Sequence, residues 1–193
     1  MIDLSNIEQY RENNRIEAKK ALGGLPQSIW ETYSAFANTL GGIILLGVEE
    51  SKDHSLHTVD LPAPEQMVEE FWAILNNPKK VSVNILTASH VQIETVDGDH
   101  IIVITVPRAQ RYDKPVYIDG NPLTGSYRRS GEGDYRCTSD EIEAMLRDAA
   151  IQTHDMQVCS EVSLDALNAE TIARCRACGN SAEDAGAPAF LLR

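Results

Sequence analysis

The sequence predicts an α+β fold in which helices pack on a mixed β-sheet. Residues 43–48 form a continuous apolar run, which is typical of a strand covered on both faces. Apolar side chains recur at helical spacing just before this run. Asp97-Gly98 lies between two β-rich runs, a strong hairpin signal that implies antiparallel neighbours. Helices and strands do not alternate as in a repeating βαβ array, so a mixed sheet is expected.

The N-terminal third predicts a helix, a strand and a second helix in that order. Residues 4–13 have the pattern of a short helix, and residues 15–19 that of a strand. Pro26 suits the first position of the next helix, because its missing N–H would have no partner there. The apolar face of this helix extends to Leu40, and we expect Gly41 to end it, since glycine tolerates a left-handed turn.

The remaining elements follow from the same patterns. We expect a helix over residues 64–76 and strands over residues 80–86, 91–95, 101–106, 116–118 and 126–130. Thr138 and Glu141 have capping-box spacing, which predicts a helix from residue 140 to about residue 151. The pattern then loosens. We therefore expect one domain over residues 1–151, followed by a partly helical tail, or the stub of a longer C-terminal region, over residues 152–193.

Composition limits the class of protein. At 193 residues the chain can bury a core without disulfides. It has no run of 18 apolar residues and no apolar signal core near its start, so we expect a cytoplasmic protein that spans no membrane. Its four cysteines are then expected to be reduced thiols. Cys175-x-x-Cys178, with His154 and Cys159, is only a weak indication of a zinc site, because the second pair lacks the standard spacing of zinc ligands.

Charge is distributed unevenly along the chain. The net charge of −12 argues against broad phosphate binding. Residues 108–136, however, carry six bases and four acids, whereas residues 49–107 carry three bases and ten acids. Within the basic segment, Arg128, Arg129 and Arg136 are interleaved with tyrosines, a composition that suits phosphate and base-stacking contacts. The alternative is a solvent-exposed edge strand that carries cations to prevent edge-to-edge pairing.

Two glycines at 41–42 separate the predicted helix from the predicted central strand. No G-x-x-x-x-G-K-[ST] motif occurs, so a P-loop ATPase is excluded. The glycines precede the strand instead of following it, which excludes a dinucleotide-binding fingerprint. They are expected to stop the helix and to allow close helix–strand packing. Alternatively, Asn38, Thr39 and the glycine amides line a groove.

Four glutamates are candidates for metal binding. Glu12 and Glu17 bracket the start of the strand at residues 15–19, and Glu49 and Glu50 follow the apolar run. If the two strands pair, these acids meet at one end of the sheet. Together with Lys19 they could then hold Mg²⁺ or Mn²⁺ for phosphodiester hydrolysis. The alternative is that they are ordinary surface acids.

Several of these segments occur together in one known family. They are ENNRIEAKKA, AFANTLGG, IILLGVEE, KPVY, YRRSGEG and TSDEIEAML, in this order between residues 12 and 146. With them the sequence resembles the Schlafen-type, Alba-like DNA-binding domain found in predicted bacterial transcriptional regulators. Two departures from that family's pattern are Ala18 in place of an aromatic residue, and glutamates in place of aspartates after the strand.

The resemblance implies an α+β fold with a mixed sheet and a nucleic-acid role. In Schlafen proteins a similar core is an endoribonuclease with two glutamates five residues apart and a later acid, a spacing that Glu12, Glu17 and Glu49 or Glu50 reproduce. Domains of this type can pair, so a homodimer is compatible with the resemblance.

Three functions are therefore predicted as alternatives. The first is a DNA- or RNA-binding domain of a transcriptional regulator, with contacts from Arg15, Lys19, Lys20, Asn38, Arg128, Arg129 and Arg136. The second is an endoribonuclease that depends on Mg²⁺ or Mn²⁺, with Glu12, Glu17, Glu49 and Lys19 as catalytic residues and Glu12, Glu17, Glu49 and Glu50 as metal ligands. The third is an acidic module for protein interaction or oligomerisation.

Overall fold

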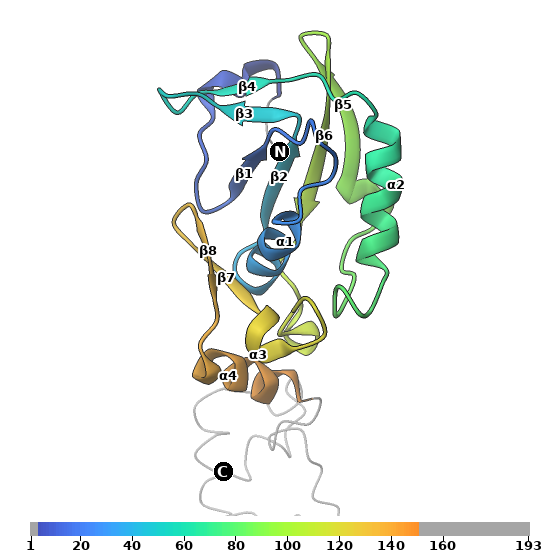
Figure 1. The fold of residues 1–193 in the computed structure, drawn as a ribbon. Helices are drawn as coiled ribbons and strands as arrows, with labels where there is room; N and C mark the ends of the chain where they lie inside the picture. The colour runs from blue at the N-terminus through green and yellow to red at the C-terminus, as the bar shows by residue number, and fades with distance from the viewer. Residues whose placement is uncertain (1–3, 151–193) are drawn as a thin grey trace, which may run out of the picture. The chain divides into compact units, whose positions relative to one another are not determined.

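The computed structural model describes residues 4–150, which are built around a four-stranded sheet (Figure 1). The strand order is β1-β2-β6-β5, with β1 (Ile16–Lys19), β2 (Gly42–Leu46), β6 (Asp99–Val106) and β5 (Val91–Val96). β1 and β2 are parallel, and the other two pairs are antiparallel. The predicted mixed sheet and α+β fold class are therefore confirmed. The predicted hairpin is also present, with Asp97 and Gly98 both at positive φ between β5 and β6.

Two helices cover one face of the sheet (Figure 1). They are α1 (Ile29–Asn38) and α2 (Pro64–Leu75), close to their predicted positions. Trp30 of α1 stacks on Phe71 of α2 with ring centroids 5.3 Å apart. Both rings are fully buried against Ile44 and Ile104 of the sheet, so this face holds the larger of the two hydrophobic clusters.

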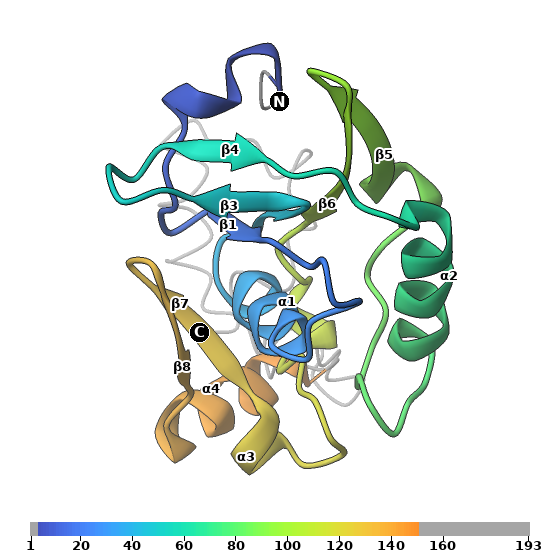
Figure 2. The same ribbon diagram turned by 45° about the horizontal axis from the view of Figure 1, so that its top comes forward.

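The second face of the sheet is covered only in part. Leu45 and Val103 pack there against Ile7 of the 3₁₀ helix η1 (Leu4–Gln9). They also pack against the hairpin of β3 (Val48–Glu50) and β4 (Leu56–Thr58), which Figure 2 shows crossing one end of the sheet. The other end of this face remains open to solvent.

A second hairpin lies beside α1 and consists of β7 (Tyr127–Ser130) and β8 (Gly133–Arg136) (Figure 2). The short helices of the described chain are η2 (Ala88–His90), η3 (Arg111–Asp113) and α3 (Pro122–Gly125). The last helix is α4 (Ser139–Ala149), and its predicted capping box is present. The Thr138 N–H donates to Glu141 Oε2 at 2.8 Å, and the Glu141 N–H donates to Thr138 Oγ1 at 3.3 Å.

Four element predictions were wrong. Residues 4–13 form only the short η1, which is kinked at Asn6. The apolar run 43–48 is not one strand, because Gly47 at φ +80° breaks it between β2 and β3. Residues 80–86 and 116–118 make only isolated bridges. Residues 80–86 do not form a strand in part because Tyr33 of α1 occupies their backbone groups. Tyr33 Oη donates to Val83 O and accepts from the Ile85 N–H.

The predicted tail over residues 152–193 and the zinc pattern lie outside the described residues.

The double glycine at 41–42 makes the sharp turn from α1 into β2. Gly41 has φ +75°, and its N–H donates to Phe36 O at 2.9 Å, which closes the helix. A Cβ on Gly42 would lie 2.7 Å from ring atoms of Phe36, which is fully buried. The expected helix stop and close packing are both found, and side chains at these positions would force the helix away from the strand.

Gly42→Ala is expected to destabilise the domain by about 1–3 kcal/mol, because the added methyl overpacks a ring that has no room to move. The matched control is Gly23→Ala, where a Cβ would meet nothing within 4 Å. Urea denaturation of both variants measures the difference in the free energy of unfolding. Equal stability of the two variants would show that the Phe36 contact does not restrict this turn.

Candidate functional site

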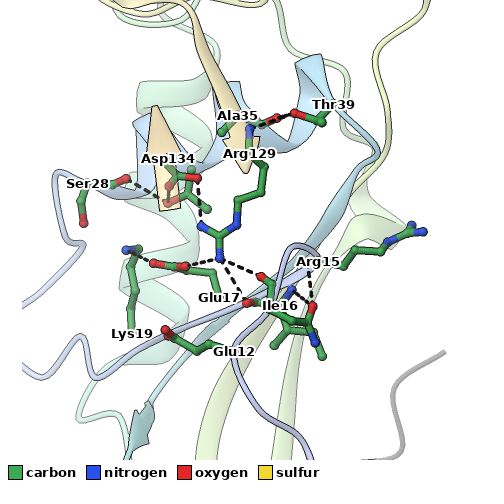
Figure 3. A network of polar contacts seen from close by, with 12 residues as sticks. Glu12, Arg15, Ile16, Glu17, Lys19, Ser28, Ala35, Thr39, Arg129 and Asp134 are labelled. Carbon is green, nitrogen blue, oxygen red and sulfur yellow. Dashed lines mark hydrogen bonds and ion pairs between the residues drawn. The ribbon is translucent and has the colours of Figure 1, made fainter. Parts of the chain in front are cut away.

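Arg129 lies at the centre of a polar network inside the domain (Figure 3). Its side chain is only 1% exposed because the alternation of β7 turns Tyr127 and Arg129 inward. The guanidinium lies 5.1 Å from the centroid of the Phe36 ring, a cation–π contact. The Arg129 N–H also donates to Thr39 Oγ1 at the end of α1. Strand β7 is thus attached to α1 through backbone and side chain together.

Two carboxylates pair with this guanidinium. Nη2 lies 2.8 Å from Glu17 Oε2 on β1, and Nη1 lies 2.9 Å from Asp134 Oδ1 on β8. Nη2 also donates to Asn13 O, and Thr32 of α1 donates to the second oxygen of Asp134. Burial alone would lower the pKa of Arg129, but the hydrogen bonds and charges of Asp134 and Glu17 raise it. One cation therefore joins the sheet edge, the hairpin and α1.

The two glutamates with the predicted five-residue spacing lie beside this cation (Figure 3). Glu17 has both oxygens in ion pairs, since Lys19 Nζ lies 2.9 Å from Oε1. Glu12 accepts the Ala18 N–H at 2.9 Å. Partial burial raises the pKa of Glu12, and the negative charges of Glu17 and Glu50 raise it further, against the opposing effect of the Ala18 hydrogen bond.

The structure separates the other two predicted acids from the end of the central strand. Glu49 and Glu50 lie on β3, because the chain turns at Gly47. Glu49 pairs with Lys20 at 2.6 Å, and Glu50 with His54 at 2.9 Å.

The carboxylates, as they lie, do not fit a divalent cation. Within residues 4–150, no three His, Cys, Asp or Glu side chains form a group that could hold a metal ion. The two oxygens of Glu17 that Mg²⁺ or Mn²⁺ would need face Arg129 and Lys19 instead. In this arrangement Glu17 binds the guanidinium of Arg129 and the ammonium group of Lys19 instead of a metal ion.

Asn38, a predicted nucleic-acid contact, binds the backbone of its own domain. Its Nδ2 donates to Val116 O at 2.8 Å and to Tyr127 O at 3.0 Å, and its Oδ1 accepts the Val116 N–H at 2.8 Å. Ser34, one turn earlier in α1, bonds to the same two residues. The motif at the end of α1 therefore orders the segment before β7.

Most of the predicted phosphate-binding cations also have partners within the domain. Arg129 and Lys19 belong to the buried network, and Lys20 pairs with Glu49. Arg128 pairs with Glu141 at 3.1 Å but is 41% exposed, so it can reach a ligand. The exposed Arg136 donates to Tyr127 Oη, whose hydrogen bond and charge raise the pKa of Arg136. Arg15 is exposed, and Figure 3 shows its side chain pointing away from the network.

A groove of about 930 Å³ occupies the open end of the second sheet face. Its floor includes Ile43 and Thr105, and Arg15 and Arg108 line it at the edge where β1 begins and β6 ends. Its other polar lining residues are Tyr10, Gly41, Gly42, Ser89, His90, Gln92 and Glu94. We name this the sheet groove. Of the residues predicted to line a groove, Gly41 and Gly42 line this one, whereas Asn38 and Thr39 are not among its lining residues.

Sequence reasoning named Arg15 but missed Arg108 and Tyr10. Arg108 and Arg15 are far apart in the sequence, and only the register brings them to one edge, because Gly42 faces Val106 while Ile16 faces Ile43. It also missed Asp134. The signal for Asp134 was its position directly opposite Arg129 across the β7–β8 hairpin.

A mixed sheet with α1 and α2 on one face, and a hairpin fixed to its edge strand by a buried arginine, define a Schlafen/Alba-like α+β domain. The chain belongs to the family described as "Schlafen, AlbA_2", which matches residues 12–138. The resemblance found in the sequence is thereby confirmed.

Two solved structures are similar to the chain. One is the N-terminal domain of a Nitrosomonas europaea protein described as related to the ATP-dependent DNA helicase RecG. It is 30% identical, with a TM-score of 0.52, and the match covers 72% of this chain and 95% of that domain. The other is the DIP2311 protein of Corynebacterium diphtheriae, which is 17% identical with a TM-score of 0.46; the match covers 89% of this chain and 30% of that protein. The search of curated proteins gave no match. Within residues 4–150, no helix is long and apolar enough to cross a membrane.

Arg129→Ala is expected to destabilise the domain by about 3–5 kcal/mol, because it leaves two partly buried carboxylates without their cation. Its neighbour Arg128 provides the matched control. Arg128→Ala breaks an exposed pair and should cost less than about 1 kcal/mol. Chemical denaturation measures both free energies of unfolding. Comparable losses in the two variants would mean that the buried network contributes no more than a surface ion pair.

Proposed function

We propose that this domain binds nucleic acid, that its partner is DNA and that it serves a transcriptional regulator. Membership of the Schlafen/Alba-like family supports the proposal, as does the similar domain of a protein described as related to a DNA helicase. The observation that carries it is local charge. Two arginines and only one glutamate line the sheet groove, in a chain whose net charge is −12.

The lining of the sheet groove has the chemistry that a nucleic-acid strand requires. Arg15 and Arg108 form no ion pair with a carboxylate of the described chain, so both are available to phosphates. Tyr10 and Ile43 offer an aromatic and an apolar surface against which a base can stack. Gln92 and Thr105 add hydrogen-bonding groups. An open sheet face with arginines along one edge suits a nucleic-acid strand that lies across the β-sheet.

Replacing both groove arginines with alanine is expected to weaken DNA binding and to flatten its salt dependence. Each phosphate contact contributes a slope of about −0.9 in log K against log salt for duplex DNA and about −0.7 for single strands. The loss of Arg15 and Arg108 should therefore reduce the magnitude of this slope by about 1.8 for duplex DNA and by about 1.4 for single strands. Fluorescence anisotropy with labelled duplex and single-stranded DNA at several salt concentrations measures this change.

The matched control removes the same charge elsewhere. Lys20→Ala with Arg128→Ala deletes two exposed cations that pair with Glu49 and Glu141. If this control loses affinity and the groove variant does not, DNA binds near Lys20 and Arg128 and not in the groove. If the unmodified protein shows no binding even at about 50 mM salt, the acidic interaction or oligomerisation module is the better explanation.

The second candidate function is an endoribonuclease that depends on Mg²⁺ or Mn²⁺. The observation that favours it is that Glu12 lies near two other predicted acids: burial raises the pKa of Glu12 most, and the nearby charges of Glu17 and Glu50 raise it further. Three of the predicted acids are thus close enough to interact. Because Arg129 and Lys19 hold Glu17, cleavage by this cluster requires those ion pairs to open.

This alternative predicts that Mn²⁺ produces fragments from end-labelled transfer RNA and that both Glu17→Gln and Glu12→Gln abolish them. Glu12→Gln keeps the side-chain oxygen that accepts the Ala18 N–H, so its fold should be retained. Glu8→Gln, which changes an exposed acid, is the matched control and should leave cleavage intact. Fragments that persist in Glu12→Gln would come from another site or from a contaminating enzyme.

A further inference from the structure

A second cavity, of about 470 Å³, lies between α4 and the segment that follows β6. Three cations line it: Arg108, which also lines the sheet groove, Arg111 of η3, and Lys114. The other lining residues are Ala109, Gln110, Met145 and Asp148. We name this the basic cavity. These three cations belong to the basic segment 108–136, but Arg108, Arg111 and Lys114 are not among the ligand contacts predicted from the sequence.

The three cations form no ion pair within the described part of the domain, although the carboxylate of Asp148 also lines the cavity. Within residues 4–150, none of the ion pairs involves Arg108, Arg111 or Lys114. Burial lowers the pKa of Lys114, and the positive charge of nearby Arg108 lowers it further. Cations that repel one another in a partly buried cavity destabilise the unliganded state, and an anion would relieve this repulsion.

A hydrogen bond holds the ammonium group of Lys114 in place at the cavity. Lys114 Nζ donates to the carbonyl oxygen of Asn38, the last residue of α1. The side chain of Asn38 is held in turn by three hydrogen bonds to the backbone of Val116 and Tyr127. An ammonium group has three N–H donors, so two are left for a ligand. Arg111 is exposed, and its guanidinium offers a planar set of donors suited to phosphate oxygens.

Charge matching selects the class of anion. Three cations and the single carboxylate of Asp148 give the basic cavity an excess of two positive charges. A phosphodiester carries one negative charge, whereas a phosphomonoester carries about −1.5 to −2 at pH 7. We propose that the basic cavity binds a phosphomonoester group. Such a group occurs at the 5′ end of a nucleic-acid strand and in free nucleotides; the strand-end source rests on the proposed function.

The first arm of the test compares two single-stranded DNA oligonucleotides that differ only in a 5′-phosphate or a 5′-hydroxyl group, each labelled at the 3′ end. The protein is expected to bind the phosphorylated strand about tenfold more tightly, the effect of one or two charged hydrogen bonds. Arg111→Ala should abolish this preference for the phosphorylated strand. The control Lys79→Ala, an exposed cation outside both cavities, should retain the preference.

The second arm uses inorganic phosphate, adenosine monophosphate and adenosine, followed by ¹⁵N–¹H NMR of the backbone amides of residues 109–114. Shifts with the two phosphates but not with adenosine, reduced in Arg111→Ala, support the site even if no oligonucleotide binds. In that case the proposed function fails and the source is a free phosphomonoester. If neither the strand preference nor the amide shifts occur, the phosphomonoester proposal is overturned, whatever the affinity of the sheet groove.

Discussion

The ion network of Arg129 is the interaction on which the arrangement of this domain depends. A guanidinium that is 1% exposed stays charged, so burying it without partners would be costly; here the partners come from β1, β8 and the loop before β1. In this position the inward cation of the β7–β8 hairpin is paired with Glu17 and Asn13 outside the hairpin as well as with Asp134 within it. A buried ion pair adds little net stability compared with apolar packing, so its main effect is to specify where the hairpin docks. The Phe36 ring beneath the guanidinium extends this constraint to Gly42 and the turn into β2.

This constraint also determines what the glutamates can do. Glu17, predicted as a metal ligand, and Arg129, predicted as a nucleic-acid contact, form an ion pair with each other. Glu17 cannot hold a divalent cation while Arg129 and Lys19 occupy its two oxygens. A binding module and a nuclease of this fold therefore differ in a physical state that can be measured, namely whether the Glu17–Arg129 pair is closed. The pKa of Glu12 is raised by burial and by neighbouring acids, and the nearby charge of Arg129 opposes this rise.

The sequence predicted those elements whose pattern is set by local chemistry. The capping box at Thr138, the Asp97-Gly98 turn and the α1 face are such cases, because each depends on residues a few positions apart. Residues 80–86 failed because the side chain of Tyr33 bonds to their backbone, a contact between distant segments. The position of Arg129 likewise depends on contacts between distant segments. Arg129 has the composition of a nucleic-acid contact, yet its strand phase and its pairing with Asp134 turn it inward.

The distribution of ion pairs reconciles a net charge of −12 with the phosphate binding that we propose. Cations that pair with acids in the described chain, such as Arg129 and Lys19, stabilise the fold. Those that do not include Arg15, Arg108 and Arg111, and these three line two cavities that share Arg108. An acidic surface elsewhere repels a polyanion, and a small cationic region within it orients the approach of that polyanion. In the proposed function, such a domain binds a DNA strand in a preferred orientation. Its overall affinity for DNA is then lower than that of a uniformly basic protein. The salt slope of binding should consequently be shallow, since few phosphates are contacted.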